Sequence, residues 1–227
     1  MKSSEYNQES LKGELIGSVV DGSLSGGMEI RLDPKVSMEN IKVGTYATIH
    51  GEMGWFFGIV TDVSLASSDP HLKQYPPDVD NAFIAAVVSG TMTYGSISIL
   101  PMLTLPNILG SDQNPERAKT VPAHFSKTYR ASNRDVEIVF GKEDQKHFYI
   151  GNPLDMETKV CLNLEELVKR SVGIFGKSGT GKTFLTRLLQ IGILQSDIAS
   201  SLIFDMHSEY GWSGQDSDRT RQVKGLK

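Results

Sequence analysis

The chain carries one eight-residue run that matches every fixed position of the phosphate-binding loop consensus: Gly176, Lys177, Ser178, Gly179, Thr180, Gly181, Lys182 and Thr183. An apolar run at 171–175, typical of a buried strand, precedes it, and a run with helical spacing at 184–190 follows. This order of strand, loop and helix is the context that the motif requires, because loop N–H groups and the helix dipole then face one anion. A glycine-rich turn ahead of a core helix is the weaker alternative.

The motif predicts a role for two of these side chains in particular. Lys182 is expected to contact the β- and γ-phosphates, and the Thr183 hydroxyl is expected to ligate Mg²⁺. The sequence contains no Asn-Lys-x-Asp motif of the kind that selects guanine. We therefore expect ATP with Mg²⁺ as the cofactors of this loop.

A second candidate site follows the next predicted strand, at 201–204. Asp205 ends that strand, and Glu209 lies one turn further along the chain. In open α/β sheets the carboxyl ends of the strands carry the ligand site, so both carboxylates are candidates for approaching the metal or an attacking water. A helix cap or a loop carboxylate without a catalytic role is an equally good interpretation of Asp205.

Composition narrows the class of protein. The chain has 227 residues, 39% of them hydrophobic, with a net charge of −4 and a pI near 5.7. These values disfavour a protein that coats nucleic acid over its whole surface, but not one with a local basic channel. A single cysteine, a polar N-terminus and the lack of a membrane-length apolar run predict a cytoplasmic protein without a membrane anchor.

Four segments are expected along the chain. They are a flexible tail at 1–12, a small β-barrel at 13–130, connecting strands at 131–170 and a partial P-loop ATPase domain at 171–227. Short apolar runs between glycine-marked turns predict the barrel, and the proline-rich stretch at 67–78 and the polar stretch at 106–122 are expected to be surface loops. Strands are predicted at 15–20, 28–32, 46–50, 56–60, 83–88, 96–100, 136–140, 148–151 and 160–164, with a short helix at 165–169.

These motifs together resemble the HerA family of hexameric DNA-translocating ATPases. The resemblance rests on the P-loop at 176–183, on Asp-Met-His-Ser-Glu-Tyr at 205–210 one strand later, and on glycine-marked strands at 16–20 and 57–63 that are similar to the family's barrel, a domain shared with ATP synthase subunits. It covers roughly 15–212. The fold class it implies is an N-terminal β-barrel followed by the start of a RecA-like α/β ATPase domain.

The resemblance implies a homo-hexameric ring that encircles double-stranded DNA and uses ATP hydrolysis to move it. A partner nuclease or defence effector is expected to dock on the barrel collar. The family's later acidic pair and arginine finger find no counterpart before residue 227, so the chain is expected to be truncated and hydrolytically inert. Four basic residues are candidates for a cationic group across an interface, although a solvated basic loop is the better interpretation: Lys119, Lys127, Arg130 and Arg134.

Two further functions stay open. One is a non-enzymatic module in which the barrel serves ring assembly or partner docking and the ATPase site is incomplete. The other is a P-loop switch or small-molecule kinase, which ranks last because such proteins usually lack a preceding barrel of this length.

Overall fold

The computed structural model of the chain describes residues 13–69, 71–75, 77, 80–88, 93–106, 114–206, 210, 214–215 and 222–223. The fold divides into two compact units. The barrel unit comprises Met1–Val139 with Pro153–Thr158, and the P-loop unit comprises Phe140–Asn152 with Lys159–Lys227. The predicted tail at 1–12 lies outside the described residues.

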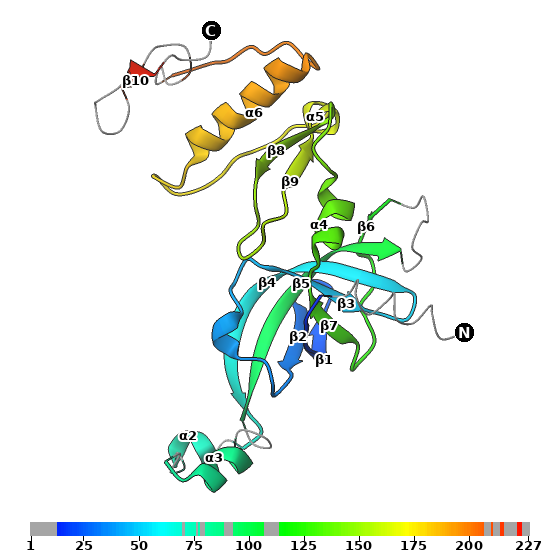
Figure 1. Ribbon diagram of the computed structural model, residues 1–227, viewed down its shortest axis with the longest axis vertical. Helices are drawn as coiled ribbons and strands as arrows, with labels where there is room; N and C mark the ends of the chain where they lie inside the picture. The colour runs from blue at the N-terminus through cyan, green and yellow to red at the C-terminus, as the bar shows by residue number, and fades with distance from the viewer. Residues whose placement is uncertain are drawn as a thin grey trace. The chain divides into compact units, whose positions relative to one another are not determined.

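A closed antiparallel barrel forms the barrel unit (Figure 1). Its strands follow the order β2-β1-β7-β3-β4-β5, and β5 pairs back with β2 to close the sheet. A short strand, β6 (Glu116–Arg117), pairs with the outer part of β5. The six barrel strands are β1 (Leu15–Ser23), β2 (Gly27–Leu32), β3 (Tyr46–His50), β4 (Gly54–Ser67), β5 (Thr93–Pro106) and β7 (Lys127–Arg130).

The predicted β-barrel is thereby confirmed, and the alternation of apolar and polar residues explains its core. Ile30, Ile49, Ile97 and Ile99 are fully buried inside it, because inward-facing positions recur at every second residue of a strand. Gly17 of β1 is needed where β2 passes close by, since a Cβ there would lie 2.2 Å from the carbonyl oxygen of Arg31. The core is thus made by short strands that are far apart in the sequence.

Two segments that the sequence predicts as strands, 83–88 and 136–140, lie in helices in the structure, so these two predictions are wrong. The run at 83–88 lies largely in α3 (Ala82–Val87), where the Asn81 side chain accepts hydrogen bonds from the N–H groups of Phe83 and Ile84 at 3.0 and 3.4 Å. The proline-rich stretch before it contains a further short helix, α2 (His71–Gln74). A side-chain cap that satisfies the first amides favours a helix over an extended strand.

The run predicted as a strand at 136–140 belongs to α4 (Asn133–Phe140). Ser132 and Asp135 form a reciprocal capping pair at its start: the Ser132 N–H and hydroxyl both donate to the Asp135 carboxylate at 2.7 Å, and the Asp135 N–H donates to the Ser132 hydroxyl at 3.3 Å. Val136 is fully buried. The cap and the buried position together outweigh the β-branched residues of the segment.

The P-loop unit is built from a hairpin and two helices. Strand β8 (His147–Gly151) pairs antiparallel with β9 (Val160–Asn163), followed by α5 (Leu164–Val168) and α6 (Lys182–Ser196). These four elements confirm the predictions for 148–169 and for the helix after the loop. Near the chain end, β10 (Gly214–Gln215) pairs with β11 (Gln222–Val223).

The strands predicted at 171–175 and 201–204 are not strands in the structure. A parallel strand needs hydrogen-bonded neighbours, and within the described part of the chain neither segment has one. Most of their apolar side chains are exposed. In the residues that the structure describes, no helix has the length and apolar character needed to span a membrane.

The capping pair of α4 yields a stability prediction. Replacing Ser132 by Ala removes the hydroxyl that accepts from the Asp135 N–H and donates to its carboxylate. We expect Ser132→Ala to lower the free energy of unfolding by about 1 kcal/mol. The measurement is urea unfolding followed by the fluorescence of Trp55 in the barrel. Ser25→Ala, in an exposed turn, is the control, and equal midpoints for the two variants would contradict the capping role.

Candidate functional site

The helix α6 is held against the β8–β9 hairpin by close packing at one glycine. Leu189 and Ile193 are buried on this helix. At Gly192, between them in helical spacing, a Cβ would lie 2.8 Å from the ring of Phe148 on β8 and 3.1 Å from Leu164. A glycine inside a helix lowers the stability of the helix by about 1 kcal/mol relative to alanine. The close approach of Phe148 and Leu164 explains why glycine stands at position 192. The hairpin thus supports the helix whose first turn follows the loop.

The loop before α6 contains two glycines in the left-handed region of backbone space. Gly179 has φ +79° and Gly181 has φ +86°, which side-chain-bearing residues rarely adopt. A Cβ on either glycine would meet nothing within 4 Å, so backbone conformation, and not crowding, requires glycine here. Gly181 is also the N-cap of α6, and no side chain caps the helix. The first turn of α6 therefore keeps the positive end of the helix dipole available to an anion.

The Lys177 carbonyl oxygen organises the loop. It accepts hydrogen bonds from the Lys182 ammonium at 2.7 Å, from the Thr180 hydroxyl at 2.7 Å and from the Thr180 N–H at 3.4 Å. The Lys182 side chain therefore folds back over the loop that precedes it. Among the residues that the structure describes, no carboxylate forms an ion pair with Lys182, so its charge is not neutralised by an acid there.

The predicted metal ligand Thr183 is half-buried in the first turn of α6, next to Lys182. One turn later, the Thr186 hydroxyl donates to the Lys182 carbonyl oxygen at 2.9 Å. The structure therefore places Lys182 and Thr183 together at the helix start, as the motif predicts. Gly176 lies close to Thr180 and Lys182, since a Cβ on it would lie 2.5 Å from the Thr180 hydroxyl oxygen and 3.5 Å from Cγ of Lys182.

Two described residues of the second motif, Asp205 and Tyr210, are joined by a hydrogen bond, and Tyr210 lies near α6. Asp205 is half-buried, and its carboxylate accepts a hydrogen bond from the Tyr210 N–H at 2.8 Å. The guanidinium of Arg187, on α6, lies 5.8 Å from the centre of the Tyr210 ring. Glu209 lies outside the described residues. Sequence reasoning missed Arg187, although its position one helical turn after Thr183 was a signal that it lies near the loop.

Three aromatic side chains of the P-loop unit, two of which flank the loop in sequence, are largely exposed. Phe175 before it is 93% exposed, Phe184 in the first turn of α6 is 72% exposed, and Phe204 before Asp205 is 89% exposed. Side chains of this size are usually buried, and clusters of exposed apolar residues commonly mark interaction surfaces.

Three of the four basic residues considered for an interface are engaged within the barrel unit. Lys119 pairs with Glu116 at 3.6 Å, and Lys127 donates to the Ser18 hydroxyl at 3.2 Å. Arg130 donates to the carbonyl oxygen of Asn40 at 3.1 Å and pairs with Glu14 at 3.6 Å. These contacts support the interpretation of a solvated, locally paired basic segment.

Ionisable groups of the hairpin are perturbed for structural reasons. Burial raises the pKa of the Cys161 thiol, which is 1% exposed, as expected for a cysteine that acts as a small apolar residue. Hydrogen bonds from the N–H groups of Lys146 and His147 lower the pKa of Asp144. A hydrogen bond to Glu143 raises the pKa of Lys159. None of these groups lies in the P-loop itself.

The geometry agrees with a comparison against known families. Residues 148–224 match a family model described as "Helicase HerA, central domain". That match begins in β8 and includes the P-loop, α6 and Asp205, and a closed six-strand barrel precedes it. The chain is HerA-like. No curated protein matches the chain.

This match to the HerA central domain indicates an ATPase-type function for the P-loop unit. The loop also fits a nucleotide on its own geometry. Its left-handed glycines stand in open space, α6 has no side-chain cap, and Lys182 reaches over the loop. A phosphate cradle needs these three features.

The close packing of α6 is tested at Gly192. Alanine would gain about 1 kcal/mol of helix propensity, but overpacking against Phe148 and Leu164 costs about 1–3 kcal/mol. We expect Gly192→Ala to destabilise the P-loop unit by about 1 kcal/mol. Thermal unfolding measures this, with Gln195→Ala on the exposed side of α6 as the control. A higher melting temperature for Gly192→Ala would show that the helix is not closely packed on the hairpin.

Proposed function

We propose that the P-loop unit binds Mg²⁺–ATP and is the ATP-binding portion of a HerA-like, ATP-driven double-stranded DNA translocase that acts as a ring. One observation carries this proposal. The loop contains two glycines with left-handed backbone conformation, it leads into α6, which has no side-chain cap, and it lies within the segment that matches the HerA central domain. Main-chain N–H groups in such a loop bind phosphate oxygens regardless of the base.

Lys182, Thr183, Asp205 and Glu209 have separate roles in this proposal. Lys182 leaves the Lys177 carbonyl and binds the terminal phosphates, and Thr183 ligates the metal. The bound Mg²⁺ neutralises phosphate charge, and the protein supplies positioning and electrostatic stabilisation. Asp205 and Glu209 are proposed to act on the metal or the attacking water from the second motif, where the Asp205 carboxylate accepts a hydrogen bond from the Tyr210 N–H.

A homo-hexameric cytoplasmic ring around DNA is the assembly we propose. The exposed Phe175, Phe184 and Phe204 support it, because an interface with a further subunit would remove them from water. A net charge of −4 means that DNA contacts must be confined to a local channel. A nuclease or defence effector is the proposed partner on the barrel collar.

The alternative is a non-enzymatic barrel module for ring assembly or partner docking. The closed barrel with its own apolar core supports this alternative, since such a unit does not need nucleotide to be stable. Nucleotide titration distinguishes the two functions, because a barrel module for assembly or docking does not need to bind nucleotide.

Removing the loop lysine tests nucleotide binding. We expect Lys182→Ala to weaken ATP binding at least tenfold, because a charge-assisted bond to phosphate contributes about 1.5–3 kcal/mol. Isothermal titration calorimetry with Mg²⁺–ATP measures the change. Lys177→Ala is the matched control, because the backbone carbonyl of Lys177, and not its side chain, organises the loop. Equal affinities for both variants would reject the proposed role of Lys182.

The hydroxyl of Thr183 is tested by the dependence on metal. We expect Thr183→Ala to bind ATP without Mg²⁺ as the parent does, but to lose most of the gain in affinity that Mg²⁺ provides. Titrations of both proteins with and without Mg²⁺ measure this gain. Thr186→Ala, one turn along α6, serves as the control. A parent protein with the same ATP affinity in both conditions would contradict the assignment.

A further inference from the structure

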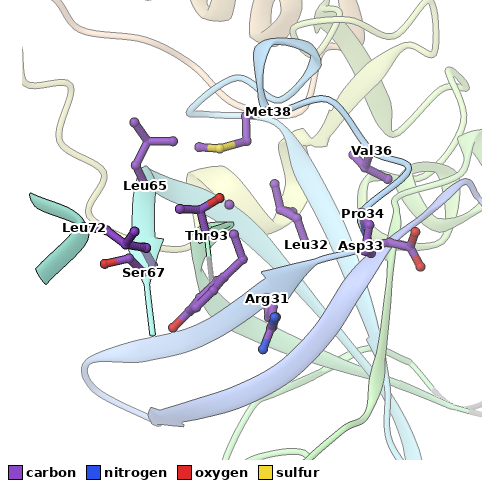
Figure 2. Close-up of a pocket in the computed structure, with 13 residues that line it drawn as sticks. Arg31, Leu32, Asp33, Pro34, Val36, Met38, Leu65, Ser67, Leu72 and Thr93 are labelled. Carbon is purple, nitrogen blue, oxygen red and sulfur yellow. The ribbon is translucent and has the colours of Figure 1, made fainter. Parts of the chain in front are cut away.

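A groove of about 480 Å³ is lined only by residues of the barrel unit. In Figure 2, Leu65, Ser67 and Leu72 line one side of it, and Leu32, Pro34 and Val36 line the other. Its volume lies in the range of about 300–1,000 Å³ that is typical of binding pockets in proteins. The groove therefore has the size and the apolar character of a binding site.

The floor of the groove is formed where a side chain is missing. At Gly95 of β5, a Cβ would lie 2.6 Å from Met38 and 2.7 Å from Leu32, so these two side chains pack directly over the strand. Leu65, on the neighbouring strand β4, is 86% exposed. An apolar side chain seated in the groove would bury Leu65 and extend a surface that Met38 and Leu32 already form.

Within the described part of the chain, one edge of β5 is unpaired beside this floor. The pairing of β2 with β5 ends at Arg31 and Ser96, and the chain leaves β2 after Leu32 into a loop that contains Pro34. From Gly95 back to Thr93, β5 continues and pairs with β4 alone. A strand with one unpaired edge next to a groove is the arrangement that binds an extended peptide by strand addition.

A cation stands at the rim of the same groove. The guanidinium of Arg31 lies 4.4 Å from the centre of the Tyr94 ring. Among the residues that the structure describes, Arg31 forms no ion pair with a carboxylate. Stacking on Tyr94 holds the guanidinium in place and leaves its planar set of donors available to an acidic group.

We infer that this groove binds an extended segment of another protein, in which a large apolar residue lies next to an aspartate or glutamate. The apolar residue fills the space over Met38 and Leu32, the carboxylate pairs with Arg31, and the segment's backbone bonds to the open edge of β5. Asp33 also lines the groove, and its carboxylate accepts a hydrogen bond from the Lys35 N–H at 3.0 Å. Charge complementarity at Arg31 therefore selects an acidic segment over a basic one. The inference deepens the partner docking proposed above for the barrel and rests on it. It does not depend on the proposed ATPase, because every residue in it belongs to the barrel unit.

The test selects a displayed library of random short peptides on the full chain and measures dissociation constants of the enriched sequences. We expect enrichment of peptides in which an acidic residue adjoins a large apolar one. Arg31→Glu should weaken these peptides at least tenfold, because it replaces a charge-assisted bond with repulsion. Lys35→Glu makes the same charge change at an exposed position outside the groove and should leave binding unchanged.

A charge swap makes the test specific to the Arg31 contact. Peptides whose acidic residue is replaced by lysine should bind Arg31→Glu more tightly than they bind the parent. Lys182→Ala should bind the original peptides as the parent does, which separates this result from the fate of the nucleotide proposal. Circular dichroism of each variant shows whether the fold is retained, and Leu65→Ser, which alters only an exposed side chain, gives a second variant of the groove.

Three results would overturn the inference. The first is no enrichment, or enrichment of basic sequences. The second is peptide binding that neither Arg31→Glu nor Leu65→Ser changes. The third is self-association of the parent, measured by sedimentation without peptide, that Arg31→Glu abolishes, because the occupant would then be a second copy of the chain.

Discussion

The pairing of β2 with β5 is the interaction on which the barrel unit depends. It joins the two ends of a sheet that would otherwise be open, with Met28 opposite Ile99 and Arg31 opposite Ser96. Closure leaves no free edge around this part of the sheet and encloses the buried isoleucines of β2, β3 and β5. The same pairing also stops at Ser96, and the groove of the barrel unit exists because β5 continues further than β2.

The P-loop unit depends on a smaller set of contacts. Gly192 allows α6 to approach Phe148 and Leu164, and the loop before the helix is closed by bonds to the Lys177 carbonyl. An exposed loop with two left-handed glycines has little side-chain packing of its own. Its geometry is instead set by backbone conformation, by main-chain acceptors and by the anchored helix.

The elements that the sequence predicted correctly have local signals. The eight residues of the P-loop, the helical spacing after it and the short glycine-bounded runs of the barrel each depend on neighbours within the same segment. The wrong predictions have a different cause. Runs such as 83–88 and 136–140 are rich in apolar and β-branched residues, but Asn81 and the Ser132–Asp135 pair cap them as helices. Intrinsic preference is a weak signal when a cap and a buried face both favour the helix.

By itself, the sequence determined the phosphate-loop motif at 176–183, the barrel character of the first half and the likeness to HerA, because fixed spacing and alternation are properties of the chain alone. Tertiary structure alone decided that Arg187 approaches Tyr210, that Lys182 folds onto Lys177, and that Arg31 stacks on Tyr94 beside an open edge of β5. These contacts join residues whose side chains meet only after the strands and helices have packed. The contact of Arg31 depends on where β2 ends in the closed sheet, and the contacts of Lys182 and Arg187 depend on how the hairpin anchors α6. No local pattern of residues specifies these contacts.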